Sequence, residues 1–259
     1  MYFVVCCVWE RRNRTETGDY GSTARAEAES FLQEIPECQR DSYYSFLAGS
    51  RFGDVCGSPY VDGVDRISAC RGVEGDDRYR YRVGVMARYE GTTDIPEHAH
   101  LARDTSLNWD LRARGLGGTK WLPLTTCAEE NILGYQIDKY HAEDILVHEF
   151  AHSIHLIGIL TVYPDFNERL KKAYDAALAA GKWKDTYAAT NIEEYWAEGV
   201  QDWFNVNAEV PKPDGKHNQV NTRKELKAYD RGLYDILSEF FPATNEQISC
   251  HKYINKYRK

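Results

Sequence analysis

The segment "DILVHEFAHSIHLIG", residues 144–158, places three histidines and one glutamate in a run that is otherwise largely apolar. His148 and His152 stand four residues apart, so on a helix both imidazoles project from one face and can bind the same metal ion. Glu149 completes the pattern H-E-x-x-H, in which the acid does not bind the metal but takes a proton from a water that zinc has acidified. The segment therefore predicts an active-site helix, capped by Asp144, that holds one zinc ion.

A catalytic zinc site needs a third protein ligand. The pattern H-E-x-x-H-x-x-G-x-x-H is excluded, because this chain has His155 and Gly158 where that pattern has glycine and histidine. We therefore expect His155 to pack or to form a hydrogen bond within the protein. His98 and His100, in "TTDIPEHAH", are expected in a surface loop, and the alternative for them is an approach to the metal in a latent state.

A carboxylate from a second helix is the other source of a third ligand. The segment "NIEEYWAEGVQDWF" offers Glu194, Glu198 and Asp202 at four-residue spacing, opposite a stripe of apolar side chains. Such a row is often a solvated face, but after an H-E-x-x-H helix we expect it to be functional. Two registers are open: Glu194 binds zinc and Glu198 holds the second nitrogen of a zinc histidine, or Glu198 binds zinc and Asp202 takes the supporting role.

The two halves of the chain differ in character, which predicts an α+β fold. "RYRYRVGVMARYE" alternates as a strand through Val83 and Val85, within sequence rich in glycine and tyrosine. Capping residues mark three helices in the second half: Asp165 with Glu168 before a helix that ends at Gly181, Thr190 with Glu193, and Thr222 with Glu225. We expect an N-terminal mixed sheet, an active-site helix and a helical C-terminal half.

No repeat or low-complexity linker divides the chain. Residues 80–242 are expected to form one metallopeptidase domain. Residues 1–79 are expected to be an extension, with a short helix at 22–36, together with the start of the sheet lobe. Residues 243–259 would form a C-terminal tail.

Composition narrows the class of partner. The 259 residues carry 32 Lys and Arg against 40 Asp and Glu, a formal charge of −8, so the chain lacks the positive surplus that nucleic-acid binding requires. The apolar run "MYFVVCCVW" is much shorter than the roughly 20 residues of a membrane span. We expect a peptide or protein partner, no nucleic acid and no membrane span.

The cysteines favour an oxidising compartment. None of the seven forms a C-x-x-C pair, so disulfides are expected rather than a zinc-thiolate site. The apolar N-terminus has the centre of a signal peptide without its basic start, and Asn13 lies in a glycosylation sequon. Together these features predict a secreted protein.

The two helical segments resemble a known family. "HEFAH" followed about forty residues later by "YAATNIEEYWAE" is similar to the catalytic domain of anthrax lethal factor and its relatives, which are zinc peptidases of the gluzincin type with a zincin-like fold. The resemblance implies the ligands His148, His152 and Glu194, the general base Glu149, the catalytic tyrosine Tyr187 and the supporting acid Glu198. It favours the Glu194 register, and it leaves Tyr195, within the helix, as a packing residue.

The lethal factor-like similarity covers about residues 144–204. A wider likeness, from about Val83 to Phe241, is to a group of predicted secreted or envelope proteins of bacteria and some eukaryotes, for which no substrate is known. Within that likeness, "RARGLGGT" provides Gly115, Gly117 and Gly118, which are either an edge that binds substrate backbone or a plain loop.

Two functions follow from these patterns. The first is a zinc-dependent peptidase in which Glu149 is the general base and Tyr187 stabilises the oxyanion. The alternative is a zinc-stabilised binding or toxin-like module that keeps the fold without cleaving, which a fourth protein ligand on the metal would favour.

Overall fold

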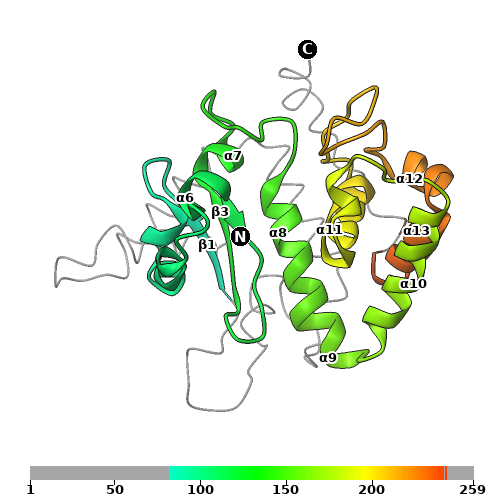
Figure 1. Cartoon of the computed structure of the whole chain (residues 1–259), viewed down its shortest axis with the longest axis horizontal. Coiled ribbons are helices and arrows are strands. Elements are labelled where there is room, and N and C mark those ends of the chain that lie inside the picture. Colours follow the sequence, from blue (N-terminus) through cyan, green and yellow to red (C-terminus); the bar gives the residue numbers. More distant parts are fainter. Residues whose placement is uncertain (1–81, 242, 244–259) are drawn as a thin grey trace.

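A computed structural model of the chain describes residues 82–241 and residue 243 (Figure 1). The helix expected at 22–36, the sequon at Asn13 and every cysteine except Cys127 lie outside the described residues. Within them the fold is α+β, with a small sheet followed by helices, as the sequence predicted.

The sheet has three strands in the order β1-β3-β2. Strand β1 (Arg82–Met86) pairs in parallel with β3 (Leu124–Ala128), and β2 (Gly115–Leu116) pairs with β3 in the antiparallel sense. The sheet is therefore mixed, and the strand predicted through Val83 and Val85 is confirmed. Cys127, in the central strand, is a buried free thiol.

Short helices connect the strands and lead to the central helix. Between β1 and β2 lie the 3-10 helices η2 (Thr92–Asp94) and η3 (Pro96–Arg103) and helix α6 (Trp109–Arg112); helix α7 (Glu129–Leu133) follows β3. Arg114, which enters β2, forms a two-pronged ion pair with Glu130 of α7, at 2.6 and 3.0 Å. This ion pair ties β2 to α7, the helix that follows β3.

Helix α8 (Ile145–Ser153) continues through a π-helical segment, η4 (Ile154–Ile159), into α9 (Leu160–Val162). By length and composition alone, Ile145–Val162 is apolar enough to cross a membrane, but 67% of it is buried inside this structure. Its apolar character is accounted for by its position, because α8 packs against β3 on one side and helix α11 (Ile192–Phe204) on the other (Figure 1).

Helices α10 (Phe166–Ala179), α12 (Arg223–Tyr229) and α13 (Arg231–Phe240) cover the outer side of α11. The predicted apolar stripe of α11 forms the centre of the core, where Trp196, Val200 and Trp203 are fully buried. The Trp196 ring packs edge-on against Phe166 of α10 and Phe240 of α13. These aromatic contacts hold α11 in place against α8.

The helix starts show which expected caps form. Asp144 caps α8, since its Oδ1 accepts from the N–H of Val147 at 3.0 Å, and Thr222 and Glu225 form the expected capping box. The expected cap of α11 was wrong by one residue: Asn191, with extended backbone, accepts from the N–H of Glu194 at 2.8 Å, whereas Thr190 still has helical dihedral angles.

Helix α10 also lacks the cap bond that was expected. Asp165 has helical dihedral angles, so its side chain does not accept from the first turn. The helix itself is confirmed, and Gly181, with φ +74°, follows its end.

We expect Asp144→Ala to lower the free energy of unfolding by about 1 kcal/mol, because α8 loses its cap. Asp165→Ala is the matched control, since that side chain makes no cap bond, and it should stay within about 0.5 kcal/mol of the native protein. Urea unfolding followed by circular dichroism measures both. Equal destabilisation by the two variants would contradict the assignment of the caps.

Candidate active site

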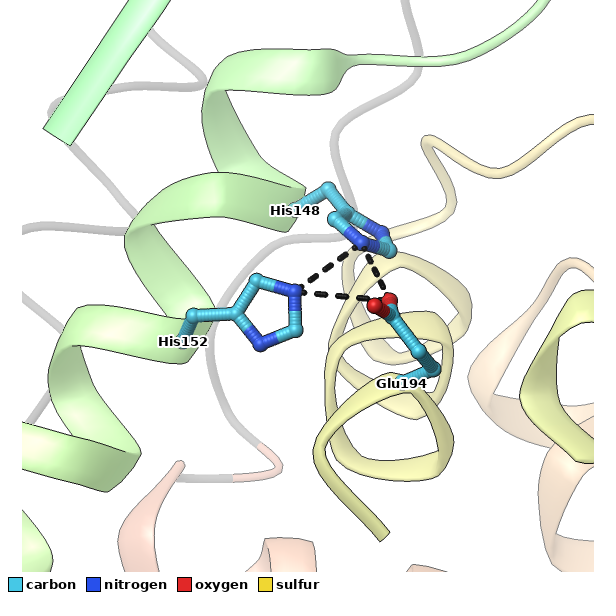
Figure 2. A group of neighbouring side chains, drawn as sticks. All are labelled: His148, His152 and Glu194. Carbon is cyan, nitrogen blue, oxygen red and sulfur yellow. Dashed lines mark hydrogen bonds and ion pairs between the residues drawn. The ribbon is translucent and has the colours of Figure 1, made fainter. Parts of the chain in front are cut away.

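Three side chains from two helices converge on one point (Figure 2). His148 and His152 come from consecutive turns of α8, and Glu194 comes from the first turn of α11. The Nε2 atom of His148 lies 3.2 Å from Nε2 of His152 and 3.0 Å from Oε2 of Glu194, and the remaining pair is 3.4 Å apart. The side chains predicted to bind the metal are thus brought together.

The spacing and chemistry of these atoms fit a zinc ion. Ligand atoms on a tetrahedral zinc with bonds of about 2.0–2.1 Å lie about 3.3 Å from one another. The three observed separations lie around this value. Two imidazole nitrogens that face each other at 3.2 Å also need a proton or a cation between them. His148, His152 and Glu194 would therefore hold the ion, leaving a fourth position open.

Gln201 fixes the orientation of the His148 ring. Its amide N–H donates to the carbonyl oxygen of Asp144 at 3.1 Å and to Glu143 at 3.3 Å, so the amide oxygen must face His148. That oxygen lies 2.8 Å from Nδ1 of His148, which is therefore the protonated nitrogen. The Nε2 lone pair is left for the metal, as in metal sites where a neighbour sets the tautomer.

The electrostatics of the site favour a cation. Burial opposes protonation of the His148 ring, but its hydrogen bond to Glu194 and the charges of Glu149 and Glu198 outweigh this effect and raise its pKa to about 10. Burial also opposes ionisation of Glu194, yet hydrogen bonds from the two histidines hold its pKa well below the ordinary value. A proton on His148 thus partly neutralises the glutamates, a task that a divalent ion performs better.

Glu149 faces the same space without belonging to the triad. It lines the cleft beside both histidines. Burial raises the pKa of Glu149, while the charges of the histidines limit the rise. A carboxylate with a raised pKa is suited to take up a proton near neutral pH.

Tyr187 lies on the 3-10 helix η5 (Tyr187–Ala189), just before α11. Its backbone N–H donates to the carbonyl oxygen of Lys216 at 2.7 Å, and its hydroxyl donates to Oε1 of Glu194 at 3.2 Å. Burial and the charge of Glu194 raise the pKa of Tyr187, so the phenol stays protonated. The competing Tyr195 is buried, and its hydroxyl donates to Asp230 at 2.6 Å, so it is a packing residue.

The two acids expected in supporting roles have different positions. Glu198 is buried and its Oε1 lies 3.5 Å from Nδ1 of His148, so it contacts the expected histidine, although Gln201 lies closer. Asp202 contacts neither histidine and does not line the cleft. It is fully buried and accepts from Asn207, which also donates to Glu198. The direct supporting role expected for Asp202 is not what the structure shows.

The site opens into a cleft of about 550 Å³. Gly115 and Gly117 line it, and both are pressed against α8: an added Cβ at Gly115 would lie 2.8 Å from Cγ of Glu149, and one at Gly117 would lie 2.5 Å from Cβ of His152. Gly118 is buried instead and donates to Ser153 at 2.8 Å. The glycines thus allow backbone to approach the metal-binding helix, and their binding of substrate stays a prediction.

The remaining histidines of the sequence analysis do not join the triad. His155 is fully buried. Its Nε2 lies 2.6 Å from Oδ1 of Asn167, and its ring packs edge-on against Phe166. His98 and His100 belong to η3 and line neither the cleft nor the triad. The expected surface loop is therefore a 3-10 helix, in which His100 is exposed and His98 is buried.

Gln201 was missed in the sequence, although a signal was present. It stands seven residues after Glu194 and three after Glu198, so a helix places all three on one face. The four-residue spacing of the acids pointed to Asp202 instead.

No protein-family model matches the chain, and no curated protein sequence matches it. Among solved structures, the chain is similar to the Pro-Pro endopeptidase PPEP-2 from Paenibacillus alvei, with a TM-score of 0.40 and 16% identity over 86% of this chain and 94% of that one. These values are too low to establish a shared fold.

We expect metal-free protein to bind one zinc ion per chain and to gain roughly 5–10 °C in melting temperature at zinc concentrations about 100 times the dissociation constant. His152→Ala and Glu194→Gln should lose most of this gain, because each removes one of three ligands. Native mass spectrometry gives the stoichiometry. His100→Ala is the control, and unchanged binding by Glu194→Gln would rule out Glu194 as a ligand.

We expect Gln201→Leu to weaken zinc binding by roughly 10- to 100-fold, because Nδ1 of His148 loses its nearest acceptor. Asp202→Asn should leave affinity unchanged, since burial raises the pKa of Asp202 well above its ordinary value and a neutral amide resembles the protonated acid. Competition with a zinc-binding dye measures both constants. The opposite ranking of the two variants would restore Asp202 as the supporting residue.

Proposed function

We propose that this protein is a zinc-dependent peptidase of the gluzincin type. The observation that carries the proposal is the convergence of His148, His152 and Glu194 in the wall of a cleft, with the carboxylate of Glu149 beside them. Zinc bound by the triad would supply a Lewis acid that acidifies a water and polarises a carbonyl.

Glu149 acts as the proton carrier. Its raised pKa lets it accept a proton from the attacking water and later pass that proton to the leaving amine. Its Cγ packs against the backbone of Gly115, where an added Cβ would lie only 2.8 Å away, so the side chain is positioned before substrate binds. Because Glu149 transfers the proton, Glu194 can serve as a metal ligand.

Tyr187 donates a hydrogen bond to the developing oxyanion. Without substrate its hydroxyl donates to Oε1 of Glu194 at 3.2 Å, so the single phenol proton must turn from Glu194 to the oxyanion. A donor aimed at this position strengthens its bond as negative charge grows on the carbonyl oxygen, which lowers the barrier more than it strengthens ground-state binding.

Strand β2 is proposed to bind the substrate backbone. It pairs with β3 along one edge, and Gly115, Leu116 and Gly117 line the cleft. An extended peptide can add to such an edge as a further strand, and the glycines let this edge lie against α8. The peptide would then run past Glu149.

The alternative of a non-cleaving, zinc-stabilised module gains no support from the described residues. A closed structural site requires a fourth protein ligand. The group capable of holding a metal in the described part of the chain contains three residues, and His155 is bonded to Asn167.

We expect Glu149→Gln to lower kcat/KM for peptide hydrolysis by roughly 10²- to 10⁴-fold while zinc binding and folding are retained, because the amide cannot take up the proton. Cut sites in a diverse peptide library, identified by mass spectrometry, give the readout. They also distinguish internal cleavage from trimming at an end.

Glu168→Gln is the matched control, since Glu168 is an exposed acid on α10, and it should cleave like the native protein. Full activity in Glu149→Gln would remove Glu149 as the base. Absence of cutting by native protein that holds one zinc would contradict the peptidase proposal.

A further inference from the structure

Two cations in the cleft are not paired with a carboxylate from the described residues. Arg112 ends helix α6 and Lys216 lies in the segment between α11 and α12, and both line the cleft. In the described part of the chain, the Arg112 side chain bonds only to the hydroxyl of Tyr187, at 3.4 Å. The Lys216 ammonium lies over the ring of Tyr140, 5.6 Å from its centroid.

The other charged groups of the cleft are bound within the protein. Arg114 is paired with Glu130, and His217 with Glu143 at 3.4 Å. Two of the glutamates are occupied as well: Glu194 by the two histidines and Glu198 by Asn207. The positive charge that this cleft can offer to a ligand is therefore that of Arg112 and Lys216.

These cations lie close to the proposed zinc site. Nη2 of Arg112 is joined to Oε1 of Glu194 through one phenol oxygen, by contacts of 3.4 and 3.2 Å. This path is no longer than about two residues of extended chain. The backbone of Lys216 contacts Tyr187 directly, because the carbonyl oxygen of Lys216 accepts a hydrogen bond from the N–H of Tyr187.

We propose that Arg112, assisted by Lys216, binds a carboxylate of the substrate that lies within about two residues of the scissile bond. A guanidinium binds carboxylates through paired, charge-assisted hydrogen bonds. The inference rests on the proposed peptidase function and adds the substrate class: peptides that carry a negative charge beside the cut.

Such a carboxylate has two sources, a free C-terminus or the side chain of Asp or Glu. Two pairs of peptides distinguish these sources. In the first pair, one sequence is compared with a C-terminal acid and with a C-terminal amide. In the second pair, the cut lies inside the peptide and is flanked either by Asp and Glu or by Asn and Gln. A preference for the acid over the amide identifies trimming at the C-terminus. A preference for Asp or Glu in amidated peptides identifies an acidic side-chain subsite.

The variant Arg112→Gln should lower kcat/KM for the preferred carboxylate peptide by roughly 10- to 100-fold more than for its neutral partner, a ratio that cancels any effect passed through Tyr187. Arg112→Lys should recover part of the loss, because it keeps the charge but not the paired geometry. The control is Arg103→Gln, since Arg103 is exposed and does not line the cleft. It should behave as native protein.

A binding measurement separates this inference from the proposed function. Fluorescence anisotropy of labelled peptides mixed with the Glu149→Gln protein measures binding without cleavage. The carboxylate peptides should bind more tightly than their neutral partners, and the double variant Glu149→Gln, Arg112→Gln should lose this difference. Such binding without cleavage by the native protein would keep the subsite and remove the peptidase. Equal binding and cleavage of charged and neutral peptides, with no effect of Arg112→Gln, would overturn the subsite and leave the peptidase standing.

Discussion

The contact between α8 and α11 is the constraint on which the rest of the site depends. His148 touches α11 at two heights, with Nε2 on Glu194 and Nδ1 on Gln201, so a small slide of one helix along the other breaks both contacts. The core sets this register: Nε1–H of Trp196 donates to the carbonyl oxygen of Ala151 at 2.9 Å, between the two metal-binding turns of α8. The helix widens to π geometry just beyond this bond, where backbone carbonyls are most available to outside donors.

That packing also imposes an electrostatic problem. It brings three glutamates around His148 in a largely buried space, and burying charge without compensation is costly. Asn207 compensates Glu198 by donating a hydrogen bond to its carboxylate at 3.0 Å. The charge on Glu194 is compensated by the imidazoles, so the cation they would jointly hold is part of the structural balance of the site as well as of its chemistry.

The sequence predicted those parts of the site that follow from helical spacing. H-E-x-x-H and the acid row each lie on one helix, so the positions of His148, His152 and Glu194 on their helices followed from periodicity, and the resemblance to lethal factor-like domains selected the register. Contacts between distant elements carried no such signal. Arg112, at the end of α6, meets Tyr187, at the start of η5, because both line the same cleft. Asn191 replaces Thr190 as the cap because Thr190 closes η5 with helical dihedral angles.

Strand β2 shows why the glycines belong to the metal site as much as to the sheet. An added Cβ at Gly117 would lie 2.5 Å from Cβ of His152, and one at Gly115 would lie 2.8 Å from Cγ of Glu149. A larger side chain at either position would push this edge of the sheet away from the helix. The strand proposed to hold the substrate and the acid proposed to move the proton are thus aligned by the same close approach of backbone to α8.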